Sequence, residues 1–310
     1  MITRPFKQID VFTHTPYLGN PLAVVLDGSG LSDQEMQHFA HWTNLSETAF
    51  LLPPTPQGAA AGADYRVRIF TPGTELPFAG HPTLGSCHAW LQAGGMPGAP
   101  THVVQECEVG MITLRREGTR LAFAAPPLTR SAPDPALLAR VTAALGLRPE
   151  QILAAQLLDN GPVWLGLLLD RVDTVLQLTP QHQMLKDLGQ KVGLVGVEQA
   201  SVARPLIARS NREARAFGPR TATPTADHEV QVEVRAFVAP VGIDEDPVTG
   251  SLNASLAQWL IAEGRLPTFY IASQGTCLGR AGRVHIAQDE AGQVWVGGNS
   301  VTCIDGTVVL

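Results

Sequence analysis

The apolar positions of this chain fall into short runs, many of which alternate with polar residues, and this pattern predicts β-strands. The predicted strands cover residues 8–13, 23–26, 48–52, 65–70, 101–105, 111–116, 120–124, 163–169 and 230–237, with more after residue 279. Helical periodicity is rarer and predicts helices from residue 32 and over residues 82–93, 135–146, 180–189 and 252–262. So few helices among so many strands favour an α/β or α+β fold over a doubly wound sheet or a TIM barrel.

Local signals define several helix ends and turns. Ser32 and Glu35 form a capping box at the start of the first predicted helix. Asp134-Pro135 is a good helix start, and Gly146 is a good stop. Glycine and proline are frequent, with 30 and 24 residues, which predicts many tight turns. Three segments rich in Gly, Ala, Pro or polar residues are predicted to be a loop, a linker and a long loop: residues 55–63, 126–135 and 210–227.

One strand–turn–helix pattern occurs twice, at residues 68–95 and 235–264. Each copy has an Arg-x-Phe strand end, a Glu-x-Pro-x-x-Gly turn and a helix closed by a glycine. In both copies the turn Gly lies five positions after the Glu, and the closing Gly lies fourteen positions later. The Glu and Gly residues of the turn are Glu75 and Gly80 in the first copy and Glu245 and Gly250 in the second. The repetition predicts two related domains.

The helices after the two turns are apolar on every side, which predicts that they are buried on every side. We therefore expect two similar domains, each a curved mixed β-sheet wrapped around one central helix. Helix N-termini carry free N–H groups and partial positive charge, so two of them facing across an interdomain cleft would bind a carboxylate. Gly80 and Gly250 would allow close approach of the backbone, and His81 and Ser251 would add hydrogen bonds.

The proline-rich linker gives the domain boundaries. Residues 1–125 are predicted to form an N-terminal domain, and residues 126–279 a C-terminal domain. The β-rich tail, about residues 280–310, is expected to return to the N-terminal domain and complete it.

Two acidic residues lie beside the expected cleft. Asp246 precedes Gly250 by four positions, and Glu47 lies where a predicted helix passes into a strand. Moving a proton between two carbons needs a group that takes it and returns it, and carboxyl groups do so when a dry site raises their pKa. Each residue also has an ordinary explanation, because a loop Glu is usually solvated, Asp-Pro is a common turn, Ser251 suits an N-cap, and a lone His81 is more often structural.

Composition removes several classes of function. The net charge is −6 with only three lysines, so no surface for nucleic acid or an anionic membrane is expected. No apolar run is long enough for a membrane span, and the first residues lack a signal-peptide pattern, so we expect a cytoplasmic protein. The four cysteines form no CxxC pair, and no GxGxxG or GxxxxGK[ST] motif follows an early strand, so zinc, redox dithiol and nucleotide cofactor signals are missing.

Six motifs together resemble the phenazine-biosynthesis PhzF-like family, over nearly the whole chain. They are Gly19-Asn-Pro-Leu-Ala-Val-Val25, Asn44-Leu-Ser-Glu-Thr48, Phe70-Thr-Pro72, Glu75-Leu-Pro-Phe-Ala-Gly-His-Pro-Thr83, Glu245-Asp-Pro-Val-Thr-Gly-Ser251 and Val296-Gly-Gly-Asn-Ser-Val-Thr-Cys-Ile-Asp-Gly306. The resemblance implies a diaminopimelate-epimerase-like fold with the active site between two domains. It also implies no metal, no organic cofactor and a homodimer.

The resemblance further implies a reaction. The family member with a known reaction isomerises trans-2,3-dihydro-3-hydroxyanthranilate, and its residue matching Glu47 moves a proton from C3 of the substrate towards C1. Residues matching His81, Asp246 and Ser251 assist or hold the substrate. Asn20 falls at a substrate-side turn of the wider fold.

Three functions remain open from the sequence. The first is a cofactor-free isomerase that moves a proton on a small carboxylate, with Glu47 as general acid/base. The second is an amino-acid epimerase or racemase, which the sequence disfavours because the thiols of the related epimerases fall at Ala79 and Thr249. The third is a protein that binds a small molecule without turning it over.

Overall fold

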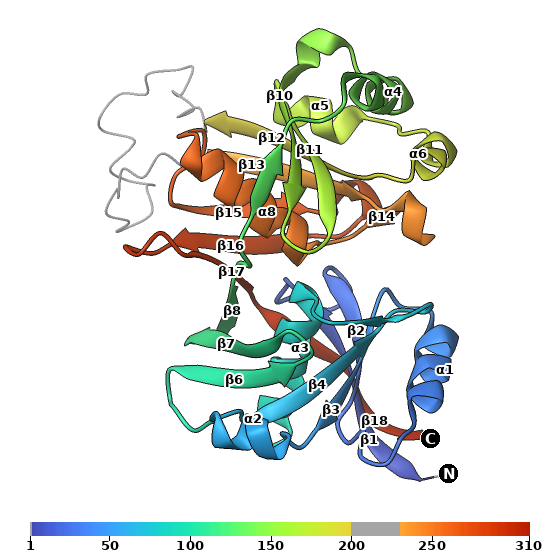
Figure 1. Cartoon of the computed structure of the whole chain (residues 1–310), viewed down its shortest axis with the longest axis vertical. Helices are drawn as coiled ribbons and strands as arrows, with labels where there is room; N and C mark the ends of the chain where they lie inside the picture. The colour runs from blue at the N-terminus through green and yellow to red at the C-terminus, as the bar shows by residue number, and fades with distance from the viewer. Residues whose placement is uncertain (1, 200–229) are drawn as a thin grey trace, which may run out of the picture.

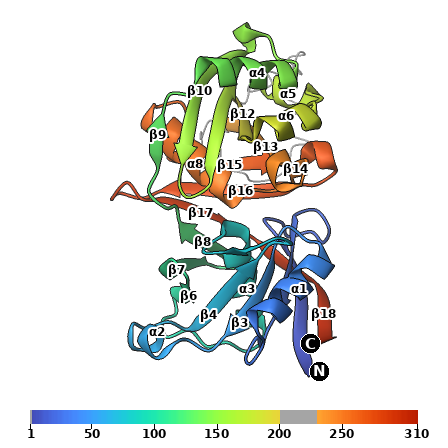
Figure 2. The ribbon, with the colours of Figure 1, turned by 45° about the vertical axis from the view of Figure 1, so that its right-hand side comes forward.

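The computed structural model describes residues 2–199 and 230–310, and the long loop predicted at residues 210–227 lies outside this part. Figures 1 and 2 show two bodies stacked along the long axis of the molecule. The helices are α1 (Asp33–Thr43), α2 (Pro56–Ala60), α3 (Gly80–Gln92), α4 (Pro135–Leu145), α5 (Val172–Gln177), α6 (His182–Leu188) and α8 (Gly250–Ala262). The strands of the first body are β1 (Thr3–Val11), β2 (Asn20–Val25), β3 (Thr48–Leu52), β4 (Tyr65–Phe70), β5 (Glu75–Leu76), β6 (His102–Cys107), β7 (Gly110–Glu117), β8 (Arg120–Ala124) and β18 (Ser300–Val309). Those of the second body are β9 (Thr129–Ser131), β10 (Ile152–Asp159), β11 (Val163–Leu169), β12 (Lys191–Gln199), β13 (Val230–Phe237), β14 (Glu245–Asp246), β15 (Phe269–Gln274), β16 (Gly282–Gln288) and β17 (Val294–Gly298).

The strands form one continuous sheet that passes from one body to the other. In the first body the pairing runs β18–β1–β2–β3–β4–β6–β7–β8. In the second it runs β17–β16–β15–β13–β12–β11–β10–β9, and β8 pairs with β17 to join the two. The parallel pairs β2–β3 and β4–β6 correspond to β11–β12 and β13–β15, so the duplication seen in the sequence extends to the strand order.

Each body encloses one helix. In the first body, α3 packs against β1, β2, β3, β4, β6 and β8. In the second body, α8 packs against β10, β16 and β17. Glycines make room for them, since a Cβ on Gly85 of α3 would collide with Leu22 of β2, and a Cβ on Gly193 of β12 would collide with Leu252 of α8. The expected fold class, two similar units in each of which a curved mixed sheet wraps around a buried helix, is confirmed, with the sheet continuous between the units.

The Glu of each repeated turn forms an ion pair with the Arg of the preceding strand. Arg68 donates to both carboxylate oxygens of Glu75 at 2.7 Å. Arg235 donates to both oxygens of Glu245 at 2.9 and 2.8 Å. These bidentate pairs hold the short strands β5 and β14 against β4 and β13. The two Glu residues of the motif therefore shape the turn.

The last strand returns to the beginning of the chain. β18 pairs with β1 along its whole length, and the backbones of Ile2 and Leu310 are hydrogen-bonded. Figure 1 shows both termini side by side at the end of the first body. The domain boundaries at residue 125 and near residue 280 stay a prediction.

The predicted loop at residues 55–63 contains a helix, so that interpretation was wrong. Thr55 caps α2 by accepting from the Gly58 N–H at 2.9 Å. The Thr55 N–H and hydroxyl both donate to the Glu106 carboxylate, at 2.8 and 2.6 Å. Glu106, which lies 51 residues further along the chain, stabilises this turn. A prediction from local composition cannot include a partner so distant in the sequence.

The second body also departs from the sequence prediction. The predicted linker at residues 126–135 contains β9, which pairs with β10. Strands β10 and β12 and helix α5 were not predicted. Two glycines weaken the strand pattern of β12, yet the structure requires both, because Leu252 lies against Gly193 and the Val172 backbone lies against Gly196.

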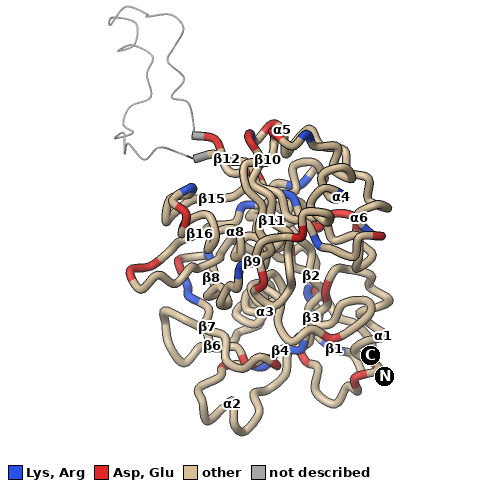
Figure 3. The backbone as a smooth tube through the Cα atoms, turned by 45° about the horizontal axis from the view of Figure 1, so that its top comes forward, with Lys and Arg blue, Asp and Glu red and all other residues tan. Residues whose placement is uncertain are grey.

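Charged residues are scattered over both bodies, with Lys and Arg interspersed among Asp and Glu (Figure 3). Among residues 2–199 and 230–310, no helix is long and apolar enough to cross a membrane.

Candidate active site

The N-termini of the two central helices meet where the bodies join. A Cβ on Gly80 would lie 3.4 Å from the Gly250 Cα and 2.7 Å from the Phe123 ring. Glycine at these positions therefore lets the two helices approach each other, whereas the sequence had suggested approach to a ligand. The N-cap residues Ala79 and Thr249 make no side-chain capping bond, so their helices keep unoccupied N–H groups at this junction.

Glu47 lies in the connection between α1 and β3. The helix ends at Asn44, whose left-handed backbone (φ 54°) turns the chain, and Thr48 then pairs with Ala23 in β2. The Glu47 side chain is 17% exposed and comes within 3.4 Å of the His81 Nδ1 through its Oε2. Burial and the negative charge of Asp246 raise the pKa of Glu47 to about 8. Its Oε2 is buried and has no hydrogen-bond partner among the described residues.

His81 stands in the first turn of α3, beside Gly80. Burial lowers the pKa of His81 to about 3, so the imidazole is neutral at physiological pH. Its Nε2 atom is buried and unpartnered within the described chain. A neutral imidazole can donate through one nitrogen and accept through the other. His81 can therefore contact both Glu47 and a bound molecule.

Asp246 comes from the second body and is held by residues on both sides of the junction. Its Oδ1 accepts from the Asn20 amide at 2.9 Å, and its Oδ2 accepts from the Thr249 hydroxyl at 2.6 Å. Asn20 also donates to the Val248 carbonyl at 2.9 Å. Burial raises the pKa of Asp246 to about 6, while these two hydrogen bonds oppose the rise. Both Asp246 oxygens are thus engaged, unlike the free Oε2 of Glu47.

A buried amide network supports the Asp246 turn. Gln274 donates to the Asp246 carbonyl at 3.1 Å and to the Thr249 hydroxyl at 2.9 Å. Its Oε1 accepts from the Thr249 N–H at 3.0 Å and from the Asn253 amide at 2.8 Å. Because nearly every group has a partner, the network fixes the position of the Asp246 carboxyl group.

Ser251 begins α8 beside Gly250 and has partners in the β10–β11 hairpin. Its Oγ accepts from the Trp164 indole N–H at 3.3 Å, which leaves the hydroxyl proton available to a ligand. Its carbonyl accepts from the Asn160 amide at 3.0 Å. Asn160 is 8% exposed, and its Oδ1 lacks a partner in the described residues.

The structure thus gathers the predicted residues at one place. Glu47, His81, Gly80 and Asn20 come from the first body, and Asp246, Gly250 and Ser251 from the second. Sequence reasoning missed the supporting residues, which are Thr249, Gln274, Asn253, Trp164, Asn160 and Lys191. Thr249 stands inside the repeated motif, and the sequence had marked it only as the position of a missing thiol. Asn253 lies on α8, and the others lie on strands and a hairpin with no motif of their own.

Metal binding has no obvious place in this arrangement. In the part of the chain that the structure covers, no group of three or more His, Cys, Asp or Glu side chains could hold a metal ion. The free thiols Cys87 and Cys107 are buried, and burial raises the pKa of both. Neither stands at the helix N-termini.

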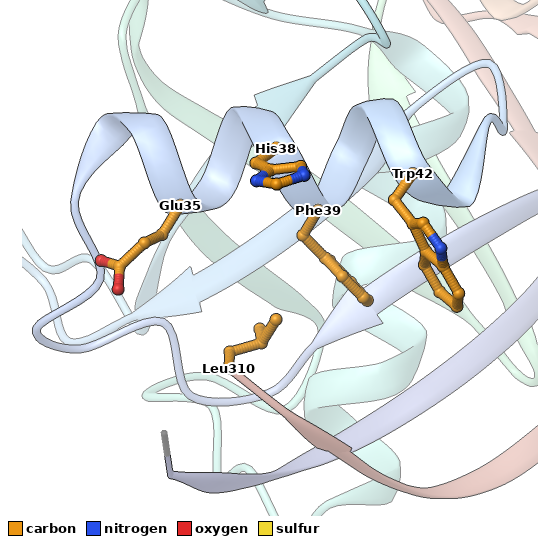
Figure 4. A pocket seen from close by; sticks show the side chains of 5 residues that line it. All are labelled: Glu35, His38, Phe39, Trp42 and Leu310. Atoms are coloured by element: carbon orange, nitrogen blue, oxygen red, sulfur yellow. The ribbon is translucent and has the colours of Figure 1, made fainter.

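A separate hollow of about 240 Å³ lies on α1, far along the first body from α8 (Figures 1 and 4). It is lined by Glu35, His38, Phe39, Trp42 and Leu310. Its one acidic side chain, Glu35, is occupied in the capping box with Ser32. The hollow therefore lacks the chemistry found at Glu47.

Two sheet-wrapped helices whose N-termini meet beside buried carboxyl groups define the fold and the candidate site, and the comparisons with known proteins give the class: a family that includes named isomerases. The chain belongs to the phenazine biosynthesis-like (PhzC-PhzF) family, whose profile matches residues 9–306. Its curated relatives include named isomerases, and the chain is an enzyme of this class.

Individual relatives cover the chain almost completely. It is 33% identical to antisense-enhancing sequence 1 of Schizosaccharomyces pombe, over 99% of both chains. It is 30% identical to trans-2,3-dihydro-3-hydroxyanthranilate isomerase of Pseudomonas aeruginosa, over 98% of this chain and 99% of that one.

Solved structures share the fold. A PhzF-family protein of Bacillus anthracis superposes with a TM-score of 0.76 at 22% identity over 100% of both chains. A hydroxyproline epimerase of Agrobacterium vitis superposes with a TM-score of 0.58 at 13% identity, over 99% of this chain and 93% of that one.

Proposed function

We propose that the chain is a cofactor-free isomerase that moves a proton between two carbons of a small carboxylate, with Glu47 as general acid/base. The observation that carries this is the Glu47 carboxyl group. It is nearly buried, has a pKa near neutrality, keeps one oxygen unpartnered, and lies 3.4 Å from a neutral imidazole. A group that must take and return a proton works best with a pKa near the operating pH.

The proposed reaction needs no co-reactant. The Glu47 carboxylate takes a proton from one carbon, and the electron pair of that C–H bond moves through a neighbouring double bond. The resulting carboxylic acid, whose proton exchanges with solvent, then protonates the far carbon, so nothing is oxidised or reduced. His81 would steady the Glu47 proton, and Asp246 would orient a polar group of the substrate through its fixed oxygens.

Binding would use the helix N-termini. The unoccupied N–H groups beside Gly80 and Gly250 and the hydroxyl of Ser251 favour a carboxylate at the junction. Asn20 would act chiefly by holding Asp246. From the named activity of the Pseudomonas aeruginosa relative, we propose a substrate similar to trans-2,3-dihydro-3-hydroxyanthranilate.

Proton NMR in D₂O tests the reaction. Wild-type protein incubated with trans-2,3-dihydro-3-hydroxyanthranilate should place deuterium on a ring carbon, while Glu47→Gln should lower the rate by roughly 10²–10⁴-fold. Exchange by the Glu47→Gln variant at the wild-type rate would refute the role of Glu47. Racemisation at a single chiral carbon would support the epimerase alternative instead, and ligand binding without exchange would support the non-catalytic binder.

The assembly is a proposal from family resemblance, and the location is a proposal from the sequence pattern. We propose a homodimer in the cytoplasm. Sedimentation equilibrium should then give twice the chain mass of 33.0 kDa, and a monomer at micromolar concentration would contradict it.

A further inference from the structure

Lys191 is a half-buried cation that forms no ion pair within the described residues. The chain has two other lysines, and they differ from it. Lys7 donates to Asp305 at 2.6 Å, and Lys186 is exposed on α6. A partly buried ammonium without a carboxylate partner is unfavourable unless another anion neutralises it.

The sheet register directs Lys191 towards the start of α8. Lys191 opens β12 and pairs with Trp164 of the parallel strand β11. Gly193, two residues further along the same strand face, contacts Leu252 in the first turn of α8. The Lys191 side chain therefore lies on the sheet face that covers α8, level with the N-terminus of that helix.

Trp164 connects Lys191 to Ser251. The Lys191 Nζ lies 5.9 Å from the centre of the Trp164 ring, and the indole N–H of the same ring donates to the Ser251 Oγ at 3.3 Å. The aromatic face holds the ammonium without neutralising it. The cation and the Ser251 hydroxyl thus both neighbour one indole, the cation at its ring and the hydroxyl at its N–H.

Two further features agree with a position of Lys191 near the junction. Its ammonium interacts electrostatically with both Glu47 and Asp246, although burial is the larger influence and lowers its pKa. Beside Ser251, the buried Asn160 keeps its Oδ1 unpartnered in the described chain while its amide nitrogen is fixed on the Ser251 carbonyl. Asn160 and Trp164 both contact Ser251, so, among the described residues, an unpartnered buried oxygen and a cation without an ion pair lie on either neighbour of the same serine, which indicates a place for a polar ligand.

We propose that Lys191 holds the anionic group of the substrate, together with the Ser251 hydroxyl and the unoccupied N-terminus of α8. This deepens the proposed function by assigning the charge that selects a carboxylate over a neutral ligand. Lys191 is a binding and positioning residue, and the proton transfer stays with Glu47. The carboxylate would be placed at α8, leaving the rest of the substrate to extend towards Glu47 and His81.

Calorimetric binding of three stable probes tests this assignment. Benzoate and anthranilate carry the carboxylate, and benzamide has the same ring without the charge. Lys191→Met should weaken benzoate and anthranilate binding at least tenfold while leaving benzamide unchanged. Lys191→Arg should restore binding to within about threefold, because it keeps the charge. Lys186→Met, which removes an exposed lysine, should bind all three probes as the wild type does.

Several outcomes would overturn the assignment. The first is that wild-type protein binds neither carboxylate. The second is that Lys191→Met binds both carboxylates as tightly as the wild type does. The third is that Lys191→Met loses as much affinity for benzamide as for the carboxylates, which would indicate structural damage. In the exchange reaction, Lys191→Met should raise KM more than it lowers kcat. Carboxylate binding that depends on Lys191 but occurs without proton exchange would refute the isomerase and leave this inference intact. Proton exchange by Lys191→Met with the wild-type KM and rate would refute this inference and leave the isomerase intact.

Discussion

At the scale of single residues, the two carboxyl groups of the junction differ in the use of their oxygens. Both oxygens of Asp246 accept hydrogen bonds, from Asn20 and Thr249, and its pKa rises only to about 6. Glu47 keeps Oε2 free, and its pKa rises to about 8. At pH 7 the favoured state is therefore an ionised Asp246 beside a protonated Glu47, and the environment alone separates their roles.

This separation predicts the pH dependence of the reaction. If Glu47 takes the first proton, kcat/KM should rise with pH and level off above an apparent pKa of about 8, because only the ionised form is a base. Asp246→Asn removes a negative charge that raises the Glu47 pKa, so the rising limb should move to lower pH. Lys191→Met removes a positive charge that lowers it, so the limb should move to higher pH.

Rates measured from pH 5 to 10 check both shifts, with Lys186→Met as the control that leaves the profile unchanged. His81 also faces Glu47, but burial lowers its pKa to about 3, so it stays neutral over this range. Movement of both variants in the same direction would contradict the electrostatic account.

At the scale of elements, the repeated turn separates structural residues from chemical ones. The acidic residue of each turn, Glu75 or Glu245, is already hydrogen-bonded to an Arg of the preceding strand. The residues available to a ligand follow, at the first helical positions. The two ion pairs share one geometry but differ in burial, since the side chains of Arg235 and Glu245 are each 5% exposed, against 17% and 31% for Arg68 and Glu75.

The difference in burial predicts a difference in stability. Glu245→Gln leaves a buried guanidinium without its counter-charge and should lower the free energy of unfolding by about 3–5 kcal/mol. Glu75→Gln breaks the more exposed pair and should cost about 1 kcal/mol or less. Urea unfolding of the two variants in parallel measures both values. Equal losses would show that burial does not govern these pairs.

At the scale of the whole molecule, the sequence predicted the overall architecture better than the strands and hydrogen bonds that hold the site in place. The duplicated turn and the all-round apolar helices predicted two similar domains and placed His81, Asp246 and Ser251 at their junction. Glu47 was singled out by its place between a helix and a strand and by the family resemblance. These patterns could not predict β12, whose glycines make room for Leu252 and Val172, or the Gln274 network. Those features depend on partners brought together only by the fold.

The hydrogen bond between Asn20 and Asp246 joins positions 226 residues apart, one in each body. It helps to determine the proton affinity of the acidic group, so the consequence of changing either residue depends on the identity of the other. The two halves of the chain are therefore not free to diverge independently. We therefore expect natural variation at these two positions to occur jointly, and a half taken from one homologue and grafted onto another would inherit only one member of a matched pair.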